Sequence, residues 1–194
     1  MTRTWAGTTL ADRRAARRER LLAAALDLLG TGGSSAVSVR AVCRGAKLTE
    51  RYFYESFADR EELVTAVYEQ VAAELRQALV DAVPDRGADA AVRAEAAVTA
   101  FVELVVDDPR KGRVLLLAPL TEPALSARGV ALLPAFAALV REQLPPRLAA
   151  DEREMTALGL VGALANLFTA YLAGTLAVSR ERLIAHCVHL LARA

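Results

Sequence analysis

The fold is decided by residues 38–57, which read SVRAVCRGAKLTERYFYESF. Ser38 is a typical helix-capping residue and precedes a helix of barely two turns over residues 39–43. A tight connection follows, and Thr49 then begins a second short helix over residues 50–54. Two short helices joined by a tight turn predict a helix-turn-helix unit, whose second helix fits the major groove of DNA.

A longer helix before this unit is expected to brace it. Leu22, Leu26 and Leu29 follow one another at steps of four and three residues, so they share one face of a helix. The glycine-rich stretch 30–33 ends that helix. Together with the two short helices it gives a three-helix DNA-binding domain, which we place at residues 13–60.

The remainder of the chain, residues 61–194, is predicted to be a helical bundle. Glycine and proline are few and punctuate a sequence rich in Ala, Leu, Val and Arg, a mixture that favours helices. Asp59 caps the helix that follows the first domain, and Pro84 ends it. No segment alternates apolar and polar residues over the length of a strand. We therefore expect an all-α protein of about nine helices.

The charge is divided unevenly between the two domains. Residues 1–60 hold eleven basic and six acidic side chains, whereas residues 61–194 hold thirteen basic and seventeen acidic ones. A basic first domain and an acidic second domain suggest that only the first domain binds a polyanion. The alternative is a chance scatter of surface arginines.

The second short helix carries the side chains expected to read DNA. Glu50, Arg51 and Tyr52 occupy its exposed positions, and the planar guanidinium of Arg51 suits a guanine edge. Tyr54 and Arg60 are better placed for phosphates, which fix register without reading sequence. The core of the domain is expected to contain Val42, Leu48, Phe53 and Phe57.

Five short motifs follow one another at fixed spacing in the first domain. They are RLLAAALDLL at residues 20–29, SVRAVC at 38–43, AKLT at 46–49, YESF at 54–57 and REEL at 60–63. This series resembles the N-terminal domain of TetR-type transcription regulators. The resemblance implies two groups of DNA contacts, which are Ser38, Thr49, Tyr54 and Arg60 at phosphates and Arg40, Glu50, Arg51 and Tyr52 near bases.

Lys47 departs from the pattern of this family. The family usually has glycine at this turn position, where a positive φ is favoured, and a left-handed lysine would cost about 1 kcal/mol. We expect either a slightly altered turn or a lysine that is tolerated because its amine reaches a phosphate. Lys47 therefore joins the candidate DNA contacts.

A long uncharged stretch lies in the second domain. Met155–Val178 comprises 24 residues without a charge, which is long enough to cross a bilayer. Asn166 within it and the acidic cluster 151–154 before it favour a buried soluble helix. One face would then meet the chain's own core and the other a second copy, and small residues permit the close approach: Gly159, Gly162 and Ala163.

The second domain is expected to hold a dimer interface and an effector site. A two-fold dimer presents two recognition helices about 34–36 Å apart, so the operator should be near-palindromic. The family resemblance implies that helices at 151–174 and 179–193 form the four-helix bundle of the dimer, and that the middle helices, about 88–143, enclose the effector. The side chains expected to line this pocket, each of which also fits an ordinary core, are Phe101, Leu104, Leu116, Phe136, Phe168 and Tyr171, with Asn166 for orientation.

Catalysis, metal binding and cofactors are not expected. The chain has no glycine-rich phosphate loop and no evident nucleophile–base arrangement. His186 and His189 lie three residues apart, but no carboxylate pair accompanies them, so we expect no metal. Cys43 and Cys187 are far apart, which favours buried, reduced thiols in a cytoplasmic protein over a disulfide.

The favoured hypothesis is a cytoplasmic, homodimeric repressor that binds a double-stranded DNA operator and has no membrane contact. It leaves the operator when a largely apolar small molecule binds its body. This requires that the molecule bind the DNA-competent and the DNA-incompetent conformation with different affinity. The alternative is a helical protein-interaction or membrane-tethered module without sequence-specific DNA binding. Detergent partitioning or sedimentation separates the two.

Overall fold

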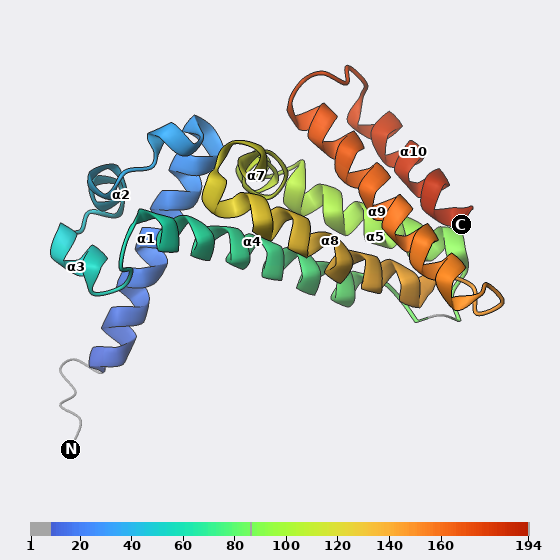
Figure 1. The fold of residues 1–194 in the computed structure, drawn as a ribbon, viewed down its shortest axis with the longest axis horizontal. Coiled ribbons are helices and arrows are strands. Elements are labelled where there is room, and N and C mark those ends of the chain that lie inside the picture. Colours follow the sequence, from blue (N-terminus) through green and yellow to red (C-terminus); the bar gives the residue numbers. More distant parts are fainter. Residues whose placement is uncertain (1–8, 86, 194) are drawn as a thin grey trace.

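The computed structural model describes residues 9–85 and 87–193, and all regular structure within these ranges is helical. The first domain lies at one end of an elongated molecule, and helix α4 runs from it along the body (Figure 1). The elements of this end are α1 (Leu10–Gly32), the short 3-10 helix η1 (Ser34–Ala36), α2 (Val39–Ala46), α3 (Glu50–Tyr54) and α4 (Arg60–Ala82).

The body is a bundle in which α8 and α9 run side by side and α10 packs on α5 (Figure 1). Because α6, the π-helical segment η2 and α7 follow one another without a break, the described residues form nine helical rods besides the short η1, in line with the prediction of about nine helices. The elements are α5 (Ala90–Val105), α6 (Pro109–Gly112), η2 (Arg113–Leu117), α7 (Ala118–Thr121), α8 (Pro123–Gln143), α9 (Ala150–Leu172) and α10 (Arg180–Ala192).

Side-chain caps fix the helix boundaries of the first domain. The Ser38 hydroxyl accepts a hydrogen bond from the main-chain N–H of Ala41 at 3.2 Å, and the Asp59 carboxylate accepts one from Glu62 at 2.8 Å. Both caps were predicted, and they satisfy N–H groups that a helix start leaves without partners.

Helix α1 begins earlier than the predicted boundary at residue 13. Thr9 and Asp12 form a reciprocal capping box, in which the Thr9 N–H donates to the Asp12 carboxylate at 2.8 Å and the Asp12 N–H donates to the Thr9 hydroxyl at 3.1 Å. This pattern satisfies two N–H groups at the first turn. The arginines at positions 13, 14, 17 and 18 therefore lie within the helix.

One apolar core joins the two domains. Leu63, Val64 and Val67 of α4 are at most 2% exposed, and they belong to the same buried cluster as Leu21 of α1 and Val114 of η2. The predicted core residues of the first domain lie in this cluster too, with Leu48 partly buried. Helix α4 is thus shared between the helix-turn-helix unit and the body, which provides a rigid connection between them.

Candidate DNA interface and effector cavity

The exposed side of the α2–α3 unit carries two arginines that were expected near bases. The side chains of Arg40 and Arg51 are 90% and 84% exposed, and each pairs locally, Arg40 with Glu50 at 3.5 Å and Arg51 with Glu55 at 3.3 Å. Exposed ion pairs of this kind contribute little to stability. Both guanidinium groups can therefore exchange their carboxylate partner for a base or a phosphate at small cost.

Tyr52 is oriented by the first helix. The guanidinium carbon of Arg17 lies 4.5 Å from the centre of the Tyr52 ring, and the same side chain pairs with Glu55 at 3.6 Å. These contacts hold α3 against α1 through a partly shielded cation–π interaction, which contributes on the order of 1 kcal/mol. Tyr52 is accordingly half-buried, whereas Tyr54 is exposed.

Two hydroxyls lie at the starts of α2 and α3. The Ser38 oxygen accepts its cap hydrogen bond, which leaves the O–H of Ser38 to act as a donor. Thr49 precedes α3, but its side chain makes no capping hydrogen bond. Both residues are exposed, and exposed hydroxyls suit contacts with phosphate oxygens.

Lys47 keeps the left-handed conformation, with φ 53° and ψ 47°. It is the one residue other than glycine with positive φ among the described residues. Of the two alternatives, the altered turn is wrong. Arg20 of α1 supports the turn, because its guanidinium donates to the carbonyl oxygens of Ala46 and, at 3.3 Å, of Lys47. This role of Arg20 was not foreseen from the sequence.

Arg60 lies at the junction of the two domains. Its guanidinium donates through Nε to the Val37 carbonyl at 2.8 Å, and through Nη2 to the Ser34 hydroxyl at 2.8 Å and to Glu122 Oε2 at 2.7 Å. The Ser34 hydroxyl in turn donates to the same carboxylate. The hydrogen bond from Arg60 is the main reason that the pKa of Glu122 is lowered. The predicted phosphate contact of Arg60 stays a prediction, and it competes with this ion pair.

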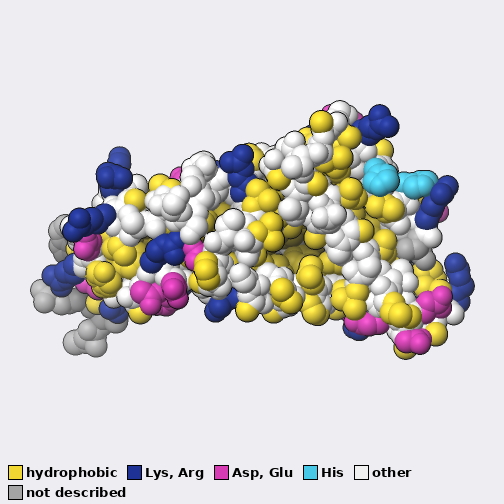
Figure 2. Space-filling view, turned by 45° about the horizontal axis from the view of Figure 1, so that its top comes forward, with side chains coloured by type: hydrophobic (Ala, Val, Ile, Leu, Met, Phe, Trp, Pro, Cys, Tyr) yellow, Lys and Arg dark blue, Asp and Glu magenta, His cyan; other side chains and the backbone are white. Residues whose placement is uncertain are grey.

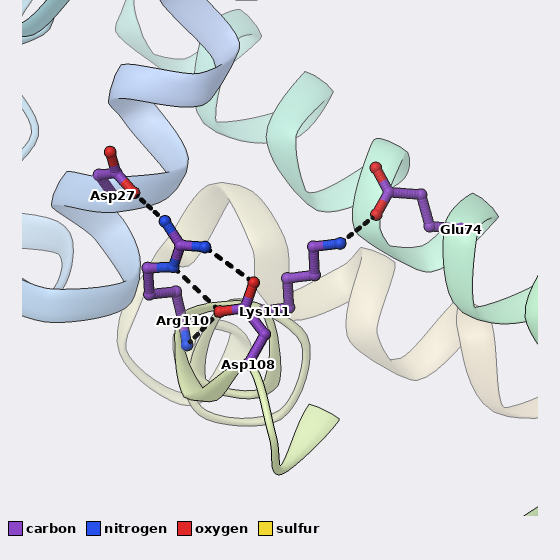
Figure 3. A network of polar contacts seen from close by, with 5 residues as sticks. All are labelled: Asp27, Glu74, Asp108, Arg110 and Lys111. Carbon is purple, nitrogen blue, oxygen red and sulfur yellow. Dashed lines mark hydrogen bonds and ion pairs between the residues drawn. The ribbon is translucent and has the colours of Figure 1, made fainter. Parts of the chain in front are cut away.

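A second polar contact joins α6 to the first domain and to α4 (Figure 3). Arg110 donates to Asp27 of α1 and, at 2.9 Å, to both carboxylate oxygens of Asp108, while Lys111 donates to Glu74 of α4 at 2.7 Å. The hydrogen bond from Arg110 lowers the pKa of Asp108. The α6 segment is thereby fixed to both α1 and α4.

The body contains a cavity of about 520 Å³ between α4, α5, η2, α8 and α9. Figure 2 shows a hollow surrounded by hydrophobic side chains in the middle of one face of the molecule. Four of the side chains expected to line an effector pocket line this cavity, and two of them form an aromatic pair with ring centres 4.5 Å apart. The four are Phe101, Leu116, Phe136 and Phe168, of which Phe101 and Phe168 are the pair.

Three other side chains expected in the pocket lie elsewhere. Leu104 packs against the core shared by the two domains, and Tyr171 packs in the cluster between α5, α9 and α10. Asn166 is exposed, because it lies on the face of α9 opposite to Leu164 and Phe168. None of the three belongs to the cavity lining.

The polar side chains of the lining were not predicted from the sequence. Tyr68 of α4 is 2% exposed, and burial raises its pKa to about 12. The other polar residues come from the starts and ends of helices, where tertiary packing rather than periodicity decides which way a side chain points. They are Arg93, Glu142, Gln143, Arg147 and Arg193.

Comparison with known proteins assigns the first domain. Residues 21–67 match the family described as bacterial regulatory proteins, tetR family. The first domain is therefore similar to this family over those residues. No curated protein matches the sequence.

Solved structures show that the TetR-like fold extends over the body. A transcriptional regulator from Rhodococcus sp. Rha1 is similar with a TM-score of 0.73 and 21% identity, over 91% of this chain and 94% of that chain. The fatty acid degradation regulator FadR from Bacillus halodurans gives 0.76 and 13%, over 91% and 94%. The multidrug binding protein EbrR, complexed with imidazole, gives 0.66 and 22%, over 90% and 94%.

Helix α9 presents a face of small and apolar residues to the outside. Met155 and Leu158 are 65% and 42% exposed, and a Cβ added at Gly159 or Gly162 would meet no atom within 4 Å. Ala163 is exposed on the same helix. Helices α8 and α9 are both long and apolar enough to cross a membrane, and each also has residues buried inside the body.

The thiols and imidazoles of the described residues form no metal-binding cluster. Cys43 and Cys187 are free and buried, and burial raises the pKa of Cys187 to about 11. His186 and His189 are exposed on α10. Within residues 9–85 and 87–193, no group of three or more His, Cys, Asp and Glu side chains could hold a metal ion.

Proposed function

We propose that this chain is a cytoplasmic, homodimeric transcription repressor that a small, largely apolar molecule releases from DNA. The observation that carries the proposal is the double role of α4. Its first turns pack against α1 in the core of the DNA-binding domain, and Tyr68, Leu75 and Leu79 further along line the cavity. A molecule in the cavity therefore contacts the same helix that positions the helix-turn-helix unit.

The DNA contacts follow from exposure and hydrogen-bonding capacity. Arg40, Glu50 and Arg51 present charged groups on the outer side of α2 and α3, which suits base edges in the major groove. Hydroxyl and amine donors around them suit phosphates. The proposed phosphate contacts are Ser38, Lys47, Thr49 and Tyr54, and Tyr52 completes the surface near the bases. Arg60 joins the phosphate contacts only if its pair with Glu122 opens.

The regulatory ligand is supported by two kinds of observation. The cavity is of the size and apolar character that small-molecule sites have. Among proteins of similar fold, EbrR is named a multidrug binding protein and is known with imidazole and with malachite green. We propose the same kind of role for this cavity, with a ligand that binds the two conformational states of the body unequally.

The dimer is supported by the outward face of α9. Gly159, Gly162 and Ala163 allow a second helix to approach closely, and the exposed Met155 and Leu158 supply apolar area beside them. A two-fold dimer across this face and α10 would present two α3 helices to a near-palindromic operator. Covering this face would also bury apolar surface that the single chain leaves in water.

Fluorescence anisotropy with DNA from around the chain's own gene tests the proposal. We expect binding that weakens steeply with salt, because counterions are released, and an Arg51→Ala variant that loses about 1–3 kcal/mol of discrimination at one base pair. Arg128→Ala on α8, which also removes an exposed arginine, is the matched control. Absence of binding at every salt concentration would overturn the proposal, and partition into detergent would favour a membrane-tethered module.

A further inference from the structure

We infer that the cavity selects an amphipathic anion, whose charged head lies at the end of the body far from the DNA-binding domain and whose apolar tail points toward Tyr68. The inference rests on the proposed function for its regulatory consequence. It is carried by the distribution of polar and apolar side chains along the cavity.

The charged and amide side chains of the lining are concentrated at one end, whereas the Tyr68 hydroxyl lies at the other. Arg93, Gln143 and Arg147 lie where the start of α5 meets the end of α8 and the loop after it, and Arg93 Nη2 donates to the Gln143 carbonyl at 3.2 Å. Arg193 and Glu142 belong to the same part of the lining. The end of α10, the start of α5 and the α8–α9 loop lie at this end (Figure 1).

The charge of this end is positive. Three guanidinium groups and one carboxylate, that of the exposed Glu142, belong to the lining. The neighbouring Arg141 lies outside the lining and pairs with Glu154 at 2.7 Å. An anionic head that enters this end gains charge-assisted hydrogen bonds, which are shorter and stronger than neutral ones.

Gln143 supplies a side-chain amide to which the head group of a ligand can form a hydrogen bond. Its side-chain oxygen is buried and makes no hydrogen bond within the described part of the chain, and leaving a buried polar group without a partner is costly. Rotation of the amide brings its NH2 group to the same position, where it donates to a carboxylate. A ligand with a polar head therefore satisfies this side chain, whereas an alkane does not.

The opposite end of the cavity suits a tail. Tyr68 and Gly129 line it there, with the Tyr68 hydroxyl 3.8 Å from where a Cβ of Gly129 would lie. Between the ends, the walls are aliphatic and aromatic. Tyr68 and Leu79 are eleven residues apart on α4, which gives the apolar part a length of about 16 Å. An extended alkyl chain fits these dimensions better than a compact polycyclic ligand.

Calorimetric titration of the full chain with three probes tests this inference. Dodecanoate, dodecanol and dodecyltrimethylammonium share one tail and differ in head charge, and each is used below the concentration at which it forms micelles. We expect dodecanoate to bind about tenfold more tightly than dodecanol, the effect of one charge-assisted hydrogen bond, and the ammonium probe to bind most weakly. Equal affinities, preference for the ammonium probe or no binding of dodecanoate would overturn the inference.

Matched variants separate the head group from general stability. In Arg147→Gln with Arg193→Gln, the preference for dodecanoate over dodecanol should fall to less than about threefold, while dodecanol binds as before. Arg76→Gln with Arg128→Gln removes the same charge outside the lining and should change neither affinity. An unchanged preference in the first variant would place the head elsewhere and overturn the inference.

Failure of this inference is distinguishable from failure of the proposed function. If the chain binds its operator and another small molecule releases it, but dodecanoate shows no preference over dodecanol, the amphipathic anion is wrong and the repressor stands. If dodecanoate binds with the expected preference but no DNA is bound, the cavity assignment stands and the repressor is wrong.

Discussion

Arg60, the first residue of α4, and Glu122, the residue between α7 and α8, form an ion pair of 2.7 Å across the junction of the two domains. Glu122 is 4% exposed and is the one charged residue in the buried set of the described chain. Ser34 of η1 bonds to both partners. The α7–α8 corner, which leads into the cavity wall formed by α8, is thus joined directly to the segment that precedes the helix-turn-helix unit.

Glu122→Gln should destabilise the protein by about 1–3 kcal/mol, because it replaces a buried charge pair by a weaker neutral contact. Urea denaturation measures the change. Glu69→Gln removes a carboxylate from an exposed pair with Arg128 and should cost less than about 0.5 kcal/mol. Equal effects of the two substitutions would mean that burial of the Arg60–Glu122 pair contributes nothing.

The same variant also decides whether Arg60 meets DNA. If Arg60 holds the domains together, Glu122→Gln should weaken the response of DNA binding to ligand, and Arg60→Gln should have a similar effect. If Arg60 contacts a phosphate, Arg60→Gln alone should lower the slope of log affinity against log salt by about 0.9. Anisotropy over a range of salt concentrations, with and without ligand, separates the two roles.

Acid should weaken the buried pair between the first domain and the body, and also the Asp108–Arg110 contact inside the body. Hydrogen bonds from Arg60 and Arg110 lower the pKa values of Glu122 and Asp108 from their ordinary values of 4.5 and 3.8. A carboxyl whose pKa is lowered by folding stabilises the folded state at any pH above its ordinary pKa. This contribution is lost as the pH falls through the lowered pKa of the folded state. We expect the melting temperature to decrease as the pH is lowered from about 5. The decrease should be less steep in the Glu122→Gln variant. An identical pH profile for the variant would contradict this.

Lys47→Gly should relieve the left-handed lysine. The strain of about 1 kcal/mol is partly offset by the greater freedom of glycine in the unfolded chain, so the expected gain in unfolding free energy is between zero and about 1 kcal/mol. If the amine contacts a phosphate, the salt slope of DNA binding should fall by about 0.9. Lys47→Ala removes the amine but keeps the strain. It should therefore lower the salt slope of DNA binding without raising the unfolding free energy.

Much of this fold could be predicted from the sequence because its signals are local. Caps at Ser38 and Asp59, the glycines at the end of α1 and the leucine spacing in α1 depend on near neighbours in the chain, and the structure contains both caps. Helix α1 begins before the predicted domain boundary at residue 13, because the Thr9–Asp12 capping box starts it earlier.

The cavity could be predicted only in part because its lining depends on how helices pack. Aromatic residues on predicted core faces, such as Phe101 and Phe168, line the cavity. Asn166 does not, because which face of α9 turns inward is decided by contacts with α5 and α8. Arg20 and Glu122 were missed for a related reason, since each acts on a segment that is distant in sequence.

Gly162→Glu should separate the dimer from the fold of the single chain. The added side chain would meet no atom of its own chain within 4 Å of Cβ, and glutamate favours helix more than glycine does, so circular dichroism should be unchanged. At a close helix–helix contact the same side chain brings a charge and extra volume, so sedimentation equilibrium should report a monomer. Operator affinity should fall steeply, because one half-site then acts alone.

The matched control is Ala127→Glu, which adds the same charge on an exposed position of α8. It should remain dimeric and bind DNA with the affinity of the unmodified chain. If Gly162→Glu also remained dimeric, the outward face of α9 would not be the interface, and the exposed apolar residues of α8, such as Val130 and Leu133, would be the next surface to substitute. If the Gly162→Glu variant were monomeric and still bound its operator tightly, the proposal that a two-fold dimer binds the operator would be wrong.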